Sequence, residues 1–213
     1  MVNREVKTIF DRIRSLKIQG ARNIAREAVK SLAGIRNQNE LKESVEHLKK
    51  SRPTEPMMRN GLKYVLVKTD EGHTVGEAIE EFIQMMDDGL KSIAEIGSKR
   101  ILDNAKIMTF CHSSTVMAIF KKAWKEGRRF EVYVAETRPL YQGRITAKEL
   151  SACGIPTTIH TDGAVRALIN GMSLALMGVD AVTSDGHVIN KDGTSMVALS
   201  AHEARTGCAF ACE

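Results

Sequence analysis

Aromatic side chains and long apolar runs are both scarce in this chain of 213 residues. Aromatic residues make up only 5%, and no aromatic RNA-binding motif occurs, so recognition of nucleic acid by base stacking is disfavoured. No apolar run approaches the roughly 20 residues that a membrane-spanning helix needs. The first residues are charged and lack the apolar core of a signal peptide, so we expect a cytoplasmic protein without a membrane partner.

Spacings typical of metal ligands are also missing. The four cysteines, Cys111, Cys153, Cys208 and Cys212, form no C-x-x-C pair, and the histidines show no H-x-H or H-x-x-x-H spacing. We therefore expect free thiols, no metal site and no cofactor.

The charge of the chain is moderately basic, with 31 Lys and Arg against 26 Asp and Glu and a net charge of +5. Such a balance suits nucleic acid or phosphorylated metabolites. Because the basic residues are scattered among acidic ones, we favour a phosphorylated small molecule over nucleic acid.

Apolar residues recur at helical spacing through residues 1–103, which predicts a helical N-terminal domain. One helix is expected before Gly20 and a second after it. A third helix ends before Pro53, a fourth follows this proline, and a long fifth helix covers residues 75–102.

From residue 104 to residue 213 short apolar strands alternate with helices. The strands are expected at 106–110, 130–136, 156–161, 181–185 and 208–213, and the helices at about 114–126, 144–153, 163–170 and 193–206. This alternation predicts an α/β domain with a doubly wound, mostly parallel, Rossmann-like sheet and helices on both faces.

Four polar residues lie at or just after the ends of predicted strands, namely Cys111, Glu136, Asp162 and Asp185. The carboxyl ends of parallel strands meet at one edge of a sheet and form the usual ligand crevice. These four residues are therefore candidates for one site.

Cys111 lies between a predicted strand and a helix that begins near Ser113. Unpaired N–H groups at a helix start favour a thiolate and an anion, and hydroxyls of Ser113, Ser114 and Thr115 are close in sequence. The alternative is a buried thiol beside a simple helix cap, and the residues alone leave both open. A Cys-His pair with His112 is disfavoured, because adjacent residues rarely face each other.

Two further segments carry candidate residues. In ETRPLYQGR, Arg138 either binds a phosphate or carboxylate or holds the loop by pairing with an acid such as Glu136. In GVDAVTSDGHVINKDGTS, Asp180 near an apolar stretch is a candidate general acid, and Lys191 beside a helix start suits an anion. The alternative for this segment is a β-hairpin with Asp-Gly at its tip.

Together, CHSST, ETRPLYQG, TDGAV, GVDAV, DGHVINKDGT, IQGAR and SRPT resemble the family that unites regulatory subunits of translation initiation factor 2B with two sugar-phosphate isomerases. The two are methylthioribose-1-phosphate isomerase and archaeal ribose-1,5-bisphosphate isomerase. Cys111 and Asp180 match the pair that marks the isomerases. The segments KIQGARNIA and SRPT look closer to the archaeal bisphosphate enzyme.

The resemblance implies conversion of ribose 1,5-bisphosphate to ribulose 1,5-bisphosphate in AMP degradation. Cys111 would move a proton between C1 and C2, and Asp180 would help open the ring and shuttle a proton on oxygen. The implied substrate-binding residues are Gln19, Gly20, Ala21, Arg22, Arg52, Ser113, Ser114, Thr115, Arg138, Asn190 and Lys191. A homo-oligomer and a nucleotide effector are also implied. The alternative is a non-catalytic regulatory subunit that binds a nucleotide or sugar phosphate.

Three segments depart from the family pattern. Phe110-Cys111-His112-Ser113 stands where the isomerases usually have His-Cys-Asn-Ser, and Gln19-Gly20-Ala21-Arg22 stands where Arg-Gly-Ala-Gly is usual. Family members also continue beyond CAFACE, so we expect the second domain to be truncated at its C-terminus.

Overall fold

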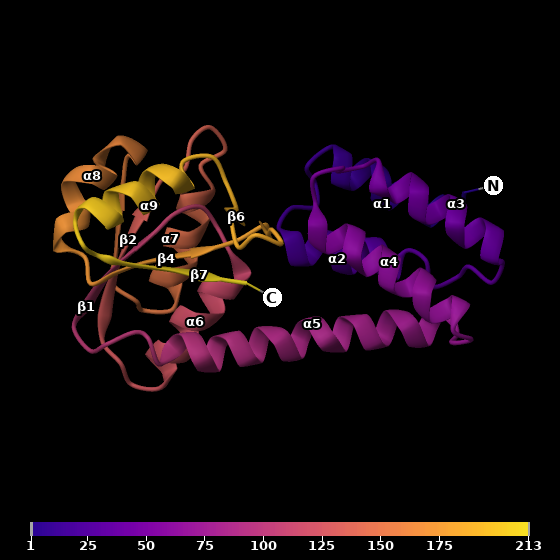
Figure 1. Cartoon of the computed structure of the whole chain (residues 1–213), viewed down its shortest axis with the longest axis horizontal. Helices are drawn as coiled ribbons and strands as arrows, with labels where there is room; N and C mark the ends of the chain where they lie inside the picture. The colour runs from indigo at the N-terminus through magenta and orange to yellow at the C-terminus, as the bar shows by residue number, and fades with distance from the viewer. Residues whose placement is uncertain (1, 213) are drawn as a thin grey trace. The chain divides into compact units, whose positions relative to one another are not determined.

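The computed structural model describes residues 2–212 of the chain, shown in Figure 1. The chain divides into two compact units, one ending at Asp88 and the other beginning at Gly89. This division falls inside a long helix, whereas the sequence predicts a domain boundary at residues 103 and 104. The difference arises because Ile93, in the last part of that helix, packs on the core of the second unit.

The first unit is entirely helical. Its helices are α1 (Arg4–Arg14), α2 (Ala21–Lys30), α3 (Gln38–Lys49), α4 (Pro56–Asp70) and the first part of α5 (Val75–Ser98). Local signals fix the helix starts, since the Asn3 and Asn37 side chains cap α1 and α3 and Pro56 lies in the first turn of α4. One apolar core, which includes Ile13, Ile24, Val29, Leu41, Leu62 and Phe82, joins these helices. The predicted helical region is confirmed.

The second unit contains a five-stranded parallel sheet in the order β3-β2-β1-β4-β7. Its strands are β1 (Ala105–Thr109), β2 (Phe130–Ala135), β3 (Thr157–His160), β4 (Leu174–Gly178) and β7 (Gly207–Ala211). The main helices are α6 (Ser114–Lys125), α7 (Gln142–Ala152), α8 (Val165–Leu168) and α9 (Thr194–Glu203), with short 3-10 turns at Asp162–Ala164 and Ile169–Gly171.

Helices cover both faces of this sheet, so the predicted doubly wound α/β architecture is confirmed. One buried cluster joins the sheet to α6 and α7 through Phe120 and Leu150, and another joins it to α8 and α9 through Val165 and Val197. Figure 1 shows α8 and α9 lying along the sheet. Since all sheet pairs are parallel, the carboxyl ends of the strands share one edge.

One predicted strand is wrong, and one strand was not predicted. Residues 181–185 do not enter the sheet, because β5 (Ala181–Val182) pairs only with β6 (Val188–Ile189) in an antiparallel hairpin. The position between β1 and β7 belongs instead to β4, whose side chains are mostly buried. A strand buried on both faces shows no alternation of polar and apolar residues, so period alone does not reveal it.

Gly143 allows the start of α7 to approach the end of β2. A Cβ atom at this position would lie 1.8 Å from the Ala135 carbonyl oxygen, which is backbone and has little room to move. We expect Gly143→Ala to lower the free energy of unfolding by about 2 kcal/mol or more in urea denaturation. The control is Gly89→Ala in α5, where no atom outside the local helix backbone lies within 4 Å of the new methyl group. This control should gain up to about 1 kcal/mol in helix propensity, and equal effects would contradict the explanation.

Candidate active site

Cys111 lies in the turn between β1 and α6, at the carboxyl edge of the sheet. Its backbone is in the left-handed region with φ of 68°, which is uncommon for a residue with a side chain. Two threonines hold this conformation, because the Cys111 N–H donates to Thr137 Oγ1 and the Cys111 carbonyl accepts from Thr146 Oγ1, both at 2.9 Å. Thr137 follows β2 and Thr146 belongs to α7, so three elements meet at the cysteine.

Charges from the β4-to-α9 segment act on the half-buried Cys111 thiol. Burial raises the pKa of Cys111 and outweighs the His112 backbone N–H and Lys191, which lower it, while Asp180 raises the pKa further. The net effect is a raised pKa, opposite in direction to the lowering expected for a thiol at a helix start. The charges of Asp180 and Lys191 thus act on the sulfur, and a shared catalytic role for these residues stays a prediction.

The His112 side chain contacts α7 rather than Cys111. Its Nδ1 lies 2.9 Å from Thr146 Oγ1, and its Nε2 lies 3.7 Å from Glu149 Oε1. Burial lowers the pKa of His112, so the ring is largely neutral at neutral pH. This arrangement agrees with the sequence argument against a Cys-His nucleophile pair.

The hydroxyl residues after Cys111 combine a capping role with a place at the site. Ser113 is the N-cap of α6, and its Oγ lies 2.7 Å from Thr115 Oγ1. Ser114 is exposed in the first turn, whereas Thr115 is buried. The capping alternative for Ser113 is thus realised, and the first N–H groups of α6 face the same turn as Cys111.

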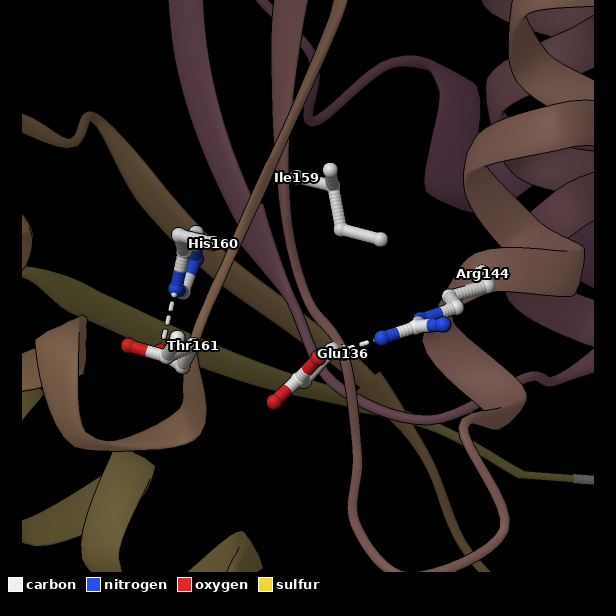
Figure 2. A pocket seen from close by; sticks show the side chains of 5 residues that line it. All are labelled: Glu136, Arg144, Ile159, His160 and Thr161. Carbon is white, nitrogen blue, oxygen red and sulfur yellow. Dashed lines mark hydrogen bonds and ion pairs between the residues drawn. The ribbon is translucent and has the colours of Figure 1, made fainter.

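Asp162 and Glu136 have structural roles in the loop after β2. The Asp162 carboxylate accepts from the backbone N–H groups of Thr137 and Arg138, each at 2.8 Å. Glu136 forms an ion pair with Arg144 at 3.0 Å. Figure 2 shows this pair beside a cavity of about 380 Å³ that Ile159, His160 and Thr161 also line.

Arg138 is exposed in the loop after β2. The loop is not held by an ion pair between Arg138 and Glu136, since Glu136 binds Arg144. Instead, Arg138 Nη1 donates to the Tyr141 hydroxyl at 2.6 Å, and the group lies 5.1 Å from the Tyr141 ring centre. The planar cation is therefore oriented but retains donors for a phosphate.

The segment after β4 carries Asp180, Asn190 and Lys191. Asp180 is exposed, and its N–H donates to the Ile189 carbonyl at the base of the β5-β6 hairpin. The expected apolar shell around this carboxyl group is absent from the described residues. Asn190 Nδ2 donates to Thr194 Oγ1 at 3.0 Å, and both Asn190 and Lys191 are half-buried before α9. Asp185 lies at the hairpin tip and pairs with His187, as the alternative prediction of an Asp-Gly hairpin requires.

The remaining predicted residues belong to the helical unit. Gln19 is exposed, Gly20 is the N-cap of α2 with φ of 84°, and Ala21 begins that helix. Arg22 is bound within the unit, since its guanidinium donates to the Met86 carbonyl at 2.8 Å and pairs with Asp87 at 3.0 Å. That pairing gives the displaced arginine of this chain a structural role.

Arg52 follows α3 in the same unit and lies 3.4 Å from Glu55, which is buried. Its side chain keeps about 39% exposure. A phosphate role for Gln19 to Arg22 and Arg52 remains a prediction.

Sequence reasoning did not identify Thr137 and Thr146, which hold the cysteine turn. Thr137 lies inside the ETRPLYQG motif, so the motif itself was the available signal. Thr146 gives no signal, since a threonine in a helix is ordinary until the tertiary fold shows its partner.

No group of three or more His, Cys, Asp or Glu side chains in residues 2–212 is arranged to hold a metal ion. Over the same residues, none of the helices has the length and apolar character that crossing a bilayer requires.

The parallel sheet and the residues gathered at its carboxyl edge define an α/β protein with its site at the strand ends. More specifically, the chain belongs to the Initiation factor 2 subunit family, whose model matches residues 13–213.

Curated relatives resemble the chain over most of its length. "Ribose 1,5-bisphosphate isomerase" of Pyrococcus furiosus is 38% identical, and the match covers 100% of this chain and 72% of that protein. The protein of the same name from Archaeoglobus fulgidus is 37% identical, with 98% and 71% covered. A "Putative translation initiation factor eIF-2B subunit 2-like" of Pyrococcus furiosus is 31% identical, with 95% and 76% covered.

A solved structure confirms the fold of the chain. The translation initiation factor eIF-2B of Pyrococcus horikoshii OT3 superposes with a TM-score of 0.91 and 27% identity, covering 99% of this chain and 79% of that one. The 5-methylthioribose 1-phosphate isomerase of the same organism, at 21% identity and a TM-score of 0.75, shares the fold.

Asp180 and Lys191, which carry opposite charges, should shift the pKa of the Cys111 thiol in opposite directions. We expect Asp180→Asn to lower the pKa of Cys111 and Lys191→Met to raise it, because Asp180 disfavours the thiolate and Lys191 favours it. At a pH below the thiol pKa, the Cys111 alkylation rate should rise roughly two- to tenfold in the first variant and fall similarly in the second. Peptide-resolved mass spectrometry after iodoacetamide treatment measures this rate at one cysteine.

The matched control is Asp185→Asn at the exposed hairpin tip, where the carboxylate pairs with His187. This variant should leave the alkylation rate of Cys111 unchanged. Shifts of the same sign in Asp180→Asn and Lys191→Met would show that the three groups do not share a site.

Proposed function

We propose that this protein is an isomerase that converts ribose 1,5-bisphosphate to ribulose 1,5-bisphosphate, a reaction of AMP degradation. The observation that carries the proposal is the Cys111 thiol at the end of β1, on which the charges of Asp180 and Lys191 act. The similarity to archaeal proteins of this name supports the substrate.

The reaction moves two protons, and one residue serves each. Asp180 donates a proton to the ring oxygen as the bond between that oxygen and C1 breaks, and its carboxylate then takes the proton from the C2 hydroxyl. The Cys111 thiolate removes the hydrogen of C2 as a proton and returns it to C1. The net result is a ketone at C2, a CH2 group at C1 and a new hydroxyl at C4, with no external oxidant or reductant.

A bisphosphate brings up to four negative charges, and the proposed ligands are basic groups and N–H or O–H donors. The sugar and one phosphate would contact Ser113, Ser114, Thr115, Arg138, Asn190 and Lys191 at the carboxyl edge of the sheet. The other phosphate would bind Gln19, Gly20, Ala21, Arg22 and Arg52 of the helical unit. Arg22 must then exchange or share its contact with Asp87.

The proposal also covers the cellular location, the oligomeric state and an effector. We place the reaction in the cytoplasm, with a homo-oligomer as the active form and a nucleotide as effector. The competing function is a non-catalytic regulatory subunit, which the 31% identity to the factor 2B-like relative favours. Such a regulator needs a phosphate pocket but no reactive thiol.

The decisive test is phosphorus NMR of ribose 1,5-bisphosphate incubated with the protein and with its Cys111→Ala variant. The unmodified protein should form ribulose 1,5-bisphosphate, and the variant should lose at least about 10³-fold in rate because the proton carrier is gone. Cys153→Ala is the matched control, since Cys153 is an exposed thiol at the end of α7.

The control should keep the full rate. Binding of the bisphosphate without any conversion would instead support the regulator. Equal rates in the Cys111→Ala variant and the unmodified protein would remove the cysteine from the mechanism.

A further inference from the structure

Both polar groups of the Cys111 backbone are bound by threonine side chains. Thr137 accepts the N–H, and its own hydroxyl donates to the Ala135 carbonyl at 3.1 Å. Thr146 donates to the Cys111 carbonyl. These contacts come from different elements, and together they fix a backbone conformation that a cysteine rarely adopts.

The Thr146 hydroxyl also sets the tautomer of His112. A carbonyl oxygen only accepts, so the single hydroxyl hydrogen of Thr146 goes to Cys111. The Thr146 oxygen must then accept from His112 Nδ1, which therefore carries the hydrogen. Nε2 holds the lone pair and faces Glu149. The result is a chain of hydrogen bonds from His112 through Thr146 to the Cys111 carbonyl.

The carbonyl that Thr146 binds and the His112 N–H belong to the same planar peptide bond. In a trans peptide these two groups point in opposite directions, so fixing one aims the other. We propose that Thr146, steadied by His112, is a positioning residue that turns the peptide between Cys111 and His112 so that its N–H faces the Cys111 sulfur.

This role rests on the proposed function of Cys111 as the proton carrier. Of the groups that act on the thiol, the His112 N–H is the first of those that lower its pKa, and it opposes the effect of burial. A hydrogen bond to a charged sulfur is stronger than one to a neutral thiol, so it favours the thiolate selectively. Thr146 thereby affects the cysteine without touching the sulfur or the substrate.

The charged groups around these hydrogen bonds do not break the contact between Thr146 and His112 Nδ1 when the pH changes. Glu149 raises the pKa of His112 and Lys121 lowers it, but protonation occurs at Nε2 and leaves the Nδ1 hydrogen in place. Lys191 and Asp180 act on the thiol from the β4-to-α9 segment. A change at Thr146 should therefore act on the titration of Cys111 through the peptide bond to His112, with the charges of Lys191 and Asp180 unchanged.

The test compares Thr146→Val with Thr146→Ser in the full chain. Valine keeps the shape of the buried threonine but removes the hydroxyl, whereas serine keeps the hydroxyl. We expect valine to move the Cys111 alkylation profile to higher pH and to lower the rate at pH 7.5 roughly tenfold. Serine should restore most of the rate, and the readout is iodoacetamide labelling resolved by peptide mass spectrometry.

The matched control is Thr206→Val. The Thr206 hydroxyl also donates to a backbone carbonyl, that of Ile169 at 3.1 Å, but it precedes β7 at the amino edge of the sheet. This variant should leave the profile unchanged. An unchanged profile in Thr146→Val, an equal shift in Thr146→Ser, or the same shift in Thr206→Val would each overturn the inference.

Should circular dichroism show that Thr146→Val does not fold, His112→Phe provides the second test. It removes the donor that steadies Thr146, so a smaller shift to higher pH is expected, and no shift would overturn the proposal. Alkylation needs no substrate. A Thr146 effect without isomerase activity would therefore refute only the proposed function, whereas activity without a Thr146 effect would refute only this inference.

Discussion

The turn after β1 depends on the two hydrogen bonds that hold the Cys111 backbone. Thr137 lies at this turn in a loop that Asp162 holds by binding the backbone N–H groups of Thr137 and Arg138, and Asp162 belongs to the 3-10 turn after β3. Thr146 reaches the turn after β1 only because Gly143 lets α7 approach the end of β2. The ETRPLYQG motif after β2 therefore supports the turn after β1 through Thr137. Its exposed residue Arg138 remains accessible to a ligand.

Under the proposed function, the protonation state of Cys111 reflects a balance that would suit a base for a carbon acid. Burial keeps the thiol neutral at rest, although Lys191 and the His112 N–H oppose it. A thiolate with a raised pKa is a stronger base once formed, but fewer molecules carry it at neutral pH. Removing a hydrogen from C2 demands a strong base, so the same burial that lowers the thiolate population strengthens each thiolate. Bound phosphates would push the pKa in the same direction, and Lys191 is placed to offset them.

Much of the fold followed from the sequence because local signals agree with the tertiary arrangement. Helical spacing, the prolines and the alternation of strands and helices predicted every major helix and most of the sheet. The strand β4 was not predicted, because Leu174 to Gly178 is apolar on both faces and shows no alternation. A strand was predicted instead at residues 181–185, which lie outside the sheet. Cys111 and Lys191 were found because they follow strand ends or precede helices, whereas Thr146 was not, since its role depends on a partner 35 positions away. The exposure of Asp180 likewise depends on the hairpin that follows it.

Phe110 and His112, the two residues beside Cys111 that depart from the family pattern, contact the surrounding helices. Their side chains support the turn that carries the cysteine. Phe110 is buried in the core beneath α8 and α9, and a Cβ on Gly193 would lie 2.5 Å from its ring. Gly193, with φ of 101°, begins α9 two positions after Lys191, so Phe110 links the cysteine turn to the lysine segment through packing. His112 instead links the turn to α7 through Thr146. Phe110 therefore anchors the cysteine turn by apolar packing on one side, and His112 anchors it by a hydrogen-bond chain on the other.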